Sequence, residues 1–377
     1  MRCKKFNHFE KFYLILYIID CKFHFFKRTL NLLYIKFKNK EETMEHRTWK
    51  AAWIDYLEPD LKFEEEALTK ENIELNAYQL RNASVEEALK HLADKDMLVV
   101  NMFPCTRNFL DSLKECKMLI RHGSGYDNVK VQDCTDNGIV FVHIPDANTF
   151  AVAEHAVTLL MATARKIRLF DSIMRESGWD WKSAQPLYQV SGKTLGVVGC
   201  GRIGSHFIHL MKGFDMRVLV YDPYIPKEKT ENELGIKIVN FETLLKESDH
   251  ISIHAPRTEE TYHLFGEAQF RLMKKTAYII NTSRGPLIEE KALVKALQEG
   301  WIAGAGIDVY EKEPPKESKE LLSIPNAVFS GHVAWYTEEA TWKMRHRIVE
   351  DLIAFNKGVR PQYVLNPEVW DKKYGKK

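Results

Sequence analysis

From Trp49 onward, the chain alternates between short apolar runs and longer segments in which apolar residues recur at helical spacing. A short apolar run predicts a buried strand, whereas apolar residues recurring once per helical turn predict one face of a helix. The predicted strands are Ala51–Ile54, Glu74–Tyr78, Met97–Asn101, Met118–Arg121, Ile139–His143, Thr194–Val198, Arg217–Tyr221, His250–Ile253, Thr276–Ile280, Ala303–Ile307 and Ala327–Ser330. This alternation is typical of an α/β protein with parallel sheets.

Helices are predicted between these strands, in SVEEALKHLAD and TRNFLDSLKEC and in a long amphipathic stretch from Thr149 to Phe170. A polar, Trp-rich segment, RESGWDWKSAQPLYQV, follows that long stretch. A chain of 377 residues has room for two domains with full cores.

The first 43 residues differ in composition from the rest. They hold 10 basic and 4 acidic residues, which leaves the chain from Met44 onward with a slight negative charge. The apolar run Tyr13–Ile19 is far shorter than the ~20 residues that a membrane-spanning helix needs. We interpret residues 1–43 as upstream sequence translated by mistake, with Met44 as the true start. The alternatives are a targeting leader and a membrane-surface anchor.

Composition limits the function classes. A net charge of +2 without a Lys/Arg stripe gives no sign of nucleic-acid binding, and the ordinary apolar fraction argues against a membrane bundle. The cysteines are scattered singly, without metal-ligand spacing, at Cys3, Cys21, Cys105, Cys116, Cys134 and Cys200. We therefore expect no metal site, no disulfide framework and a reducing compartment, the cytoplasm.

A glycine-rich turn follows the predicted strand Thr194–Val198. The pattern G-x-G-x-x-G falls on Gly199, Gly201 and Gly204, before a helical stretch and a second strand that ends in Asp222. In this context the glycines permit the tight turn, the close approach of a pyrophosphate and helix–strand packing, respectively. The backbone N–H groups around Arg202 and Ile203 would hold the phosphates, and Asp222 the ribose hydroxyl. Asp222 would repel a 2′-phosphate, so the sequence predicts NAD as the cofactor.

Segments that contain polar side chains follow four predicted strands in the second half of the chain. These segments are His254-Ala255-Pro256, Asn281-Thr282-Ser283-Arg284-Gly285, Asp308 with Glu313 five residues further on, and Gly331-His332. Ligands bind beyond the carboxyl ends of parallel strands, so these residues are expected beside a bound cofactor.

These motifs, with IRHGSGYDNV, VAEHAVTLLMATARK and SGHVAW, resemble those of the NAD-dependent D-isomer-specific 2-hydroxyacid dehydrogenases from about Trp49 to Val369. The resemblance implies two Rossmann/flavodoxin-like doubly wound lobes, with the nucleotide-binding lobe inserted in the substrate lobe. We expect the substrate lobe at 44–145 plus 337–377 and the NAD-binding domain at 146–336. The RESGWDWKSAQPLYQV segment would be the arm through which family members form homodimers.

By this resemblance Arg284, Glu313 and His332 are the catalytic residues. A histidine whose pKa lies near neutrality suits proton transfer in both directions, and Glu313 would orient its ring. The planar guanidinium of Arg284 would bind the substrate carboxylate. Cofactor contacts are expected from Gly199, Gly201, Arg202, Ile203, Gly204, Asp222, Ala255, Pro256, Thr261, Thr282, Ser283, Arg284, Asp308 and His332. Asp308 would face the nicotinamide. Substrate contacts are expected from Gly123, Ser124, Gly125, Arg284 and Trp335.

Two side chains carry open alternatives. Arg107 would meet a substrate phosphate, or would be an exposed arginine at a helix start. Trp335 would wall the substrate pocket, or would only pack. Glu154 and His155 are interpreted as structural.

The predicted function is hydride transfer between NAD and C2 of a small D-2-hydroxy or 2-keto acid of the 3-phosphoglycerate, hydroxypyruvate or glyoxylate type. The alternative is an NAD(H)-binding scaffold resembling the C-terminal-binding corepressors, which keep the same three catalytic residues.

Overall fold

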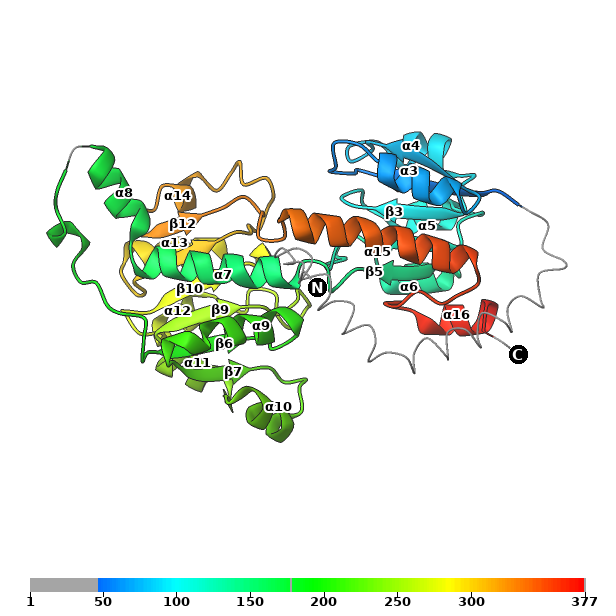
Figure 1. Cartoon of the computed structure of the whole chain (residues 1–377). Coiled ribbons are helices and arrows are strands. Elements are labelled where there is room, and N and C mark those ends of the chain that lie inside the picture. Colours follow the sequence, from blue (N-terminus) through cyan, green and yellow to red (C-terminus); the bar gives the residue numbers. More distant parts are fainter. Residues whose placement is uncertain (1–46, 177, 376–377) are drawn as a thin grey trace, which may run out of the picture. The chain divides into compact units, whose positions relative to one another are not determined.

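A computed structural model describes residues 47–176 and 178–375 of the chain (Figure 1). The predictions for residues 1–43 therefore concern residues outside the described ranges. None of the helices within those ranges has the length and apolar character that crossing a bilayer would take.

The first sheet has five parallel strands in the order β2-β1-β3-β4-β5. Its strands are β1 (Trp49–Ile54), β2 (Ile73–Tyr78), β3 (Met97–Val100), β4 (Met118–Arg121) and β5 (Val140–His143). This order is that of a flavodoxin-like doubly wound sheet.

The second sheet has seven parallel strands in the order β12-β11-β10-β9-β6-β7-β8. Its strands are β6 (Thr194–Val198), β7 (Arg217–Tyr221), β8 (Lys237–Ile238), β9 (His250–Ile253), β10 (Tyr278–Asn281), β11 (Gly304–Ile307) and β12 (Ala327–Phe329). The strand order reverses beside β6, the strand before the glycine-rich turn. A ligand is expected at the carboxyl ends of the strands at this switch point.

Both faces of the five-stranded sheet are covered by helices. One face packs on α3 (Lys62–Thr69), α15 (Glu338–Asn356) and α16 (Pro367–Lys373). The other packs on α4 (Val85–Leu92), α5 (Arg107–Ser112) and α6 (Val131–Asp136). Alternate residues of each strand serve the two cores: in β1, Ala51 and Trp53 face one core, whereas Ala52 and Ile54 face the other.

Helices α15 and α16 come from the end of the chain, yet they complete the core of the first sheet. In Figure 1 they are the orange and red helices beside the blue and cyan strands. The segment that forms the seven-stranded sheet is thus inserted in the lobe of the five-stranded sheet. The predicted fold class is confirmed, whereas the predicted lobe bounds at single residues stay a prediction.

The seven-stranded sheet also has two buried faces. Helices α7 (Thr149–Ala164) and α9 (Arg202–Met211) cover one of them, with α10 (Lys227–Leu234) at its margin. The other face packs on α11 (Phe241–Glu247), α12 (Glu267–Leu272), α13 (Glu290–Gln298) and α14 (Lys319–Leu322).

Two elements differ from the sequence prediction. Strand β8 has only two residues and does not stand out as an apolar run, so the sequence pattern did not reveal it. The stretch predicted as one helix from Thr149 to Phe170 is divided at Lys166, whose φ of 51° is left-handed. A second helix, α8 (Ile167–Arg175), follows and buries none of its residues.

Candidate active site

The glycine-rich turn lies between β6 and α9, and two of its glycines stand where a side chain would collide. Gly199 has a φ of 87°, and a Cβ atom added to it would lie 2.7 Å from the backbone nitrogen of Ala255. A Cβ on Gly204 would lie 2.2 Å from the carbonyl oxygen of Gly199. A Cβ on Gly201 would meet nothing within 4 Å, so the chain leaves free space beside the turn at that residue.

The first turn of α9 presents backbone donors to this space. The helix begins at Arg202, and its N-cap, Gly201, has no side chain to accept a hydrogen bond from the N–H groups of Arg202 and Ile203. Asp222, directly after β7, lies beside the turn because its Oδ2 accepts a hydrogen bond from the Cys200 N–H at 2.8 Å. Its Oδ1 accepts the N–H of Tyr224 at 3.0 Å. Free N–H groups and a fixed carboxylate form a cradle that fits a pyrophosphate and a ribose.

Further predicted cofactor contacts lie at the carboxyl ends of β9 and β10. Ala255 is buried, and the Thr261 hydroxyl donates to the Pro256 carbonyl at 2.7 Å, which closes the turn between them. Thr282 is buried, and its hydroxyl has no hydrogen-bond partner among the described residues. A buried hydroxyl without a partner is costly, and a bound polar ligand at this strand end would supply one. These residues therefore fit a dinucleotide.

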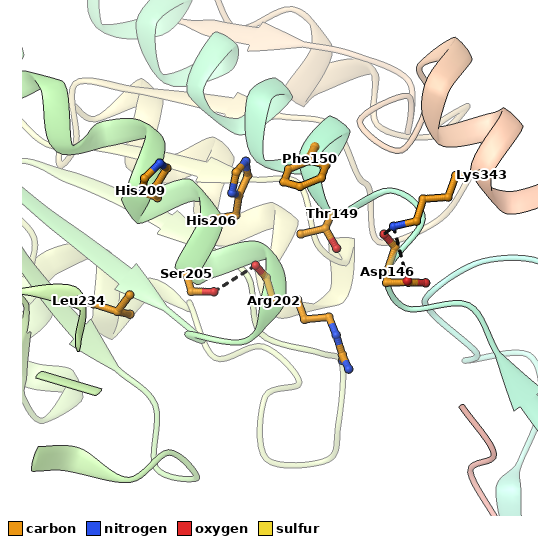
Figure 2. A pocket seen from close by; sticks show the side chains of 9 residues that line it. All are labelled: Asp146, Thr149, Phe150, Arg202, Ser205, His206, His209, Leu234 and Lys343. Atoms are coloured by element: carbon orange, nitrogen blue, oxygen red, sulfur yellow. Dashed lines mark hydrogen bonds and ion pairs between the residues drawn. The ribbon is translucent and has the colours of Figure 1, made fainter. Parts of the chain in front are cut away.

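The side chain of Arg202 extends from the first turn of α9 (Figure 2). Its guanidinium lies 5.3 Å from the ring centroid of Tyr363. One face of α9 lines a hollow of about 450 Å³ together with residues of α7 and α15, and Arg202 is the residue of this lining predicted to contact the cofactor. The full lining is Asp146, Thr149, Phe150, Arg202, Ser205, His206, His209, Leu234 and Lys343.

His332 and Glu313 form a hydrogen-bonded pair after β12 and β11. His332 Nδ1 lies 2.6 Å from Glu313 Oε2, and the two side chains are 39% and 27% exposed. Burial raises the pKa of Glu313. The hydrogen bond and the charge of His332, together with the Tyr310 N–H and the charge of Arg284, lower it by more, so the pKa lies below its ordinary value. An ionised carboxylate on Nδ1 leaves the other ring nitrogen, Nε2, for proton transfer.

Asp308 holds the turn that carries His332. It is fully buried, and its carboxylate accepts hydrogen bonds from the Ser330 hydroxyl at 2.6 Å and from the N–H groups of Val333 and Ala334 at 3.0 Å each. Its carbonyl accepts the His332 N–H at 2.6 Å. His332 has a left-handed φ of 55°, which a surrounding network must stabilise. Asp308 thus fixes the conformation of His332, and its expected contact with a nicotinamide stays a prediction.

His155 reaches the same network from α7. Its Nε2 lies 2.9 Å from the Ser330 hydroxyl, which in turn donates to Asp308. His155, which the sequence analysis interprets as structural, therefore supports the turn of His332 through Ser330.

Arg284 follows β10 and lies against the Gly123-Ser124-Gly125 turn of the other sheet. Its Nε donates to Asp127 Oδ2 at 2.7 Å, and its Nη1 donates to the Ser283 carbonyl at 2.7 Å. A Cβ atom on Gly125 would lie 1.4 Å from Arg284 Nη2, so the guanidinium needs glycine at that position. The structure brings together a catalytic and a substrate-binding candidate that lie far apart in the sequence.

Asn281 fixes the backbone between β10 and Arg284. Its Oδ1 accepts the Ser283 N–H at 3.0 Å, and its Nδ2 donates to the Arg284 carbonyl at 2.9 Å. These two hydrogen bonds fix the backbone of the short turn that carries Arg284 at the end of β10.

Arg121 and Asp127 belong to this site, although the sequence reasoning did not select them. Burial lowers the pKa of Arg121 to about 10, and the nearby charge of Arg284 contributes to that shift. Arg121 Nε donates to Asn128 Oδ1 at 3.1 Å. Both residues lie in the IRHGSGYDNV motif, in which only Gly123, Ser124 and Gly125 were assigned. Arg121 ends β4, so the strand-end criterion used in the second half would have found it.

The remaining candidates take other positions. The Ser124 hydroxyl lies 2.6 Å from Asn148 Oδ1, and Trp335 is half-buried with its ring 5.5 Å from that of Tyr336. Arg107 starts α5 and is engaged by carboxylates: its guanidinium lies 3.0 Å or less from Asp111 and Asp136 and 3.2 Å from Asp133.

One family of known proteins matches this chain by its sequence model. The model, described as "D-isomer specific 2-hydroxyacid dehydrogenase, NAD binding domain", matches residues 157–334. This range contains the glycine-rich turn, Arg284, Glu313 and His332.

Relatives with curated names are similar over most of the chain. A glyoxylate reductase of Korarchaeum cryptofilum is 42% identical over 285 residues, which cover 74% of this chain and 86% of that protein. A D-3-phosphoglycerate dehydrogenase of Archaeoglobus fulgidus is 38% identical over 284 residues, 75% of this chain but only 54% of that protein.

Solved structures have the same fold. A glyoxylate reductase from Paecilomyes thermophila superimposes with a TM-score of 0.77 at 28% identity, covering 85% of this chain and 100% of that one. A D-lactate dehydrogenase from Aquifex aeolicus, complexed with NAD and lactic acid, gives 0.75 at 28% identity over 82% of this chain and 96% of that one.

Proposed function

This chain belongs to the D-isomer specific 2-hydroxyacid dehydrogenase family of oxidoreductases, and on that premise we propose that it transfers a hydride between NAD and C2 of a small D-2-hydroxy or 2-keto acid. In this proposal His332 is the acid/base, Glu313 its partner and Arg284 the substrate-binding cation. The observation that carries it is the 2.6 Å His332–Glu313 pair, at the carboxyl edge of the sheet that holds the glycine-rich turn.

The pair suits a reaction in which a proton and a hydride move together. When bound, the nicotinamide gives or takes the hydride at C2. His332 gives a proton to the carbonyl oxygen during reduction and removes it from the hydroxyl during oxidation. Ionised Glu313 stabilises the imidazolium and holds the ring in one orientation, so that Nε2 faces the reacting oxygen.

Arg284 binds and polarises the substrate. Its Nη2 is not among the groups that Asp127 and the Ser283 carbonyl engage, and it lies at the Gly123–Gly125 turn. A guanidinium fork matches a carboxylate, and it also stabilises negative charge on a carbonyl oxygen. Backbone N–H groups of the Gly123-Ser124-Gly125 turn would complete the carboxylate site.

NAD is the expected cofactor because Asp222 already lies beside the glycine-rich turn. Its carboxylate would accept the adenosine ribose hydroxyls and repel a 2′-phosphate. Residues 255, 256, 261, 282, 283 and 308 are the further positions proposed to contact the cofactor.

The substrate types proposed are glyoxylate, hydroxypyruvate and 3-phosphoglycerate. The first two are favoured over the phosphorylated type because Arg107, the arginine considered for a phosphate, is engaged by three carboxylates. Half-buried Trp335 follows His332 closely and would limit the size of the substrate.

We also propose a cytoplasmic homodimer. Trp179 and Trp181, in the segment expected to be the dimerisation arm, are 89% and 63% exposed, and exposure of such large apolar side chains is typical of an interface. Four cysteines within residues 47–176 and 178–375 are free and buried, which fits a reducing compartment. Sedimentation of the purified protein as a monomer would contradict the homodimer.

The proposed activity is tested with a panel of 2-keto acids, followed by the loss of NADH absorbance. We expect turnover of glyoxylate or hydroxypyruvate, and greater efficiency with NADH than with NADPH. NADH binding without turnover of any member of the panel would contradict the enzyme and favour the scaffold alternative.

A further inference from the structure

One carboxylate, Asp127, faces two guanidinium groups beside the proposed substrate site. Asp127 Oδ2 accepts the Arg284 Nε–H at 2.7 Å, with the two side chains 40% and 29% exposed. Arg121 also lies within electrostatic reach: beyond the main effect of burial, which lowers the pKa of Arg121, the charge of Arg284 lowers this pKa and the charge of Asp127 raises it. The three groups therefore form one interacting cluster.

The loop that carries Asp127 is held rigidly. Its neighbour Asn128 donates through Nδ2 to the carbonyls of Asn101 and Phe103 at 3.0 and 2.8 Å, and accepts the Arg121 Nε–H at 3.1 Å. Consecutive side chains of the loop thus hold the two arginines separately. A carboxylate on such a loop can fix the direction of the guanidinium that it binds.

The charges of the cluster leave one excess positive charge. Arg121 and Arg284 supply two cations, and Asp127 cancels one of them. A second carboxylate that interacts electrostatically with Arg284 is Glu313, whose own partner is His332; the Glu313–His332 pair is neutral when the ring is protonated. One excess positive charge matches one substrate carboxylate, whereas a dianion would remain partly unpaired.

We propose that Asp127 is a positioning and specificity-determining residue: it fixes Arg284 through Nε, and it cancels one positive charge so that the site prefers singly charged 2-keto acids. The proposal rests on the proposed function, because it assigns the substrate site to Arg284. The charge of Asp127 sets which anion binds, and its hydrogen bond sets how well Arg284 is oriented for reaction.

Two variants separate these roles. Asp127→Asn keeps an oxygen that accepts the Arg284 Nε–H but removes the charge, whereas Asp127→Ala removes both. Asp136→Asn is the matched control, since Asp136 pairs with Arg107 at 2.6 Å and takes no part in the site. Each protein, saturated with NADH, is titrated calorimetrically with oxamate and with oxalate, which have nearly the same shape but one and two negative charges. The kcat with glyoxylate is measured in parallel.

We expect both Asp127 variants to shift the ratio of oxalate to oxamate affinity toward oxalate by about tenfold. This is the order of magnitude that removal of one unit charge, a few ångströms from the anion and partly exposed to solvent, predicts. We expect Asp127→Asn to keep kcat within about threefold of the wild type, and Asp127→Ala to lower it by about tenfold or more. The control should change neither value. Circular dichroism spectra that match the wild type establish that each variant is folded.

A ratio that stays within about twofold in both Asp127 variants, or that shifts equally in the control, overturns the specificity role. Equal kcat values for the Ala and Asn variants overturn the positioning role. A failure of the proposed function can be distinguished from these outcomes, because the wild-type protein would then turn over no 2-keto acid. The two titrations need no turnover, so they decide the charge role in that case as well.

Discussion

The two halves of the candidate active site are supported in different ways. The acid/base half is built within the seven-stranded sheet, because His332, Glu313 and Asp308 all follow its neighbouring strands β11 and β12. The anion-binding half joins the two sheets: Arg284 follows β10, but its partner Asp127 lies 157 residues earlier in the chain, after β4 of the five-stranded sheet.

This difference has a functional consequence. The geometry of His332 depends on residues that fold together with it, so it is set by its own sheet. The geometry of Arg284 depends on the loop of the other sheet, so changes in that loop should affect substrate binding and polarisation. Such changes should leave the His332–Glu313 pair as it is.

The largest effect is expected at the acid/base half. Replacing His332 by alanine removes the proton donor and acceptor, and general acid–base catalysis contributes about 10²- to 10⁴-fold, so we expect kcat to fall by about 10³-fold. NADH binding, measured by fluorescence titration, should change little because the cradle of α9 and Asp222 remains. His209→Ala, an exposed histidine of α9, is the matched control and should keep full activity. A His332→Ala enzyme with more than a tenth of the wild-type kcat would contradict the assignment.

The next largest effect tests the dependence of Arg284 on the five-stranded sheet. In Gly125→Ala the new Cβ would lie 1.4 Å from Arg284 Nη2, so the guanidinium must move while its charge is kept. We expect kcat/KM for glyoxylate to fall by about 10²-fold, the loss typical of a displaced oxyanion or carboxylate donor. The melting temperature should stay close to that of the wild type, because the displaced group is the end of a flexible side chain.

The control for this substitution is Gly213→Ala, where the added Cβ meets nothing within 4 Å. Equal kcat/KM values for the two glycine variants would mean that Arg284 functions without the Gly125 turn. This result would contradict the claim that the geometry of Arg284 depends on the five-stranded sheet.

The same contrast explains which parts could be predicted from the sequence. Gly199 and Asp222 directly follow apolar strands, and His332 comes three residues after the end of β12, so the strand pattern and the rule for parallel sheets place them at one edge. Arg121 ends β4, so the same rule would also place it at a sheet edge. Asp127, in contrast, acquires its role from its contact with Arg284, 157 residues away, which no local pattern encodes. The same limit applies to Lys166: a left-handed residue inside an apolar, helix-spaced stretch leaves no signal in the spacing.

A smaller effect is expected when only the charge of the acid/base half is removed. The pKa of Glu313 lies below its ordinary value, so this carboxylate stays ionised at neutral and mildly acidic pH. Glu313→Gln keeps a hydrogen-bonding side chain of the same length, but it no longer favours the imidazolium. We expect the basic limb of the kcat/KM profile for keto-acid reduction to move about one pH unit lower, an approximately tenfold loss at pH 8 with near-normal activity at pH 6. An unchanged profile would contradict the role of Glu313.

The smallest effect on activity is expected from a substitution in the lobe of the five-stranded sheet that lies outside the loop carrying Asp127. Asp351 of α15 is 3% exposed, and its Oδ2 has no hydrogen-bond partner among the residues that the structure describes. Burial raises the pKa of Asp351 to about 7, although the charge of Arg347 opposes the shift.

The folded state therefore retains a proton on Asp351 that the unfolded chain releases near its ordinary pKa of 3.8. As pH rises from about 4 to 7 the folded state loses stability, and above pH 7 the loss is complete, at up to about 4 kcal/mol. Asp351→Asn removes this dependence, so urea unfolding at a series of pH values should give a variant whose advantage over the wild type grows from pH 4 to 7 and then levels off. Its kcat and KM for glyoxylate should equal those of the wild type. A change in KM without a change in the pH dependence of stability would mean that α15 influences the site by a route other than the Asp127 loop.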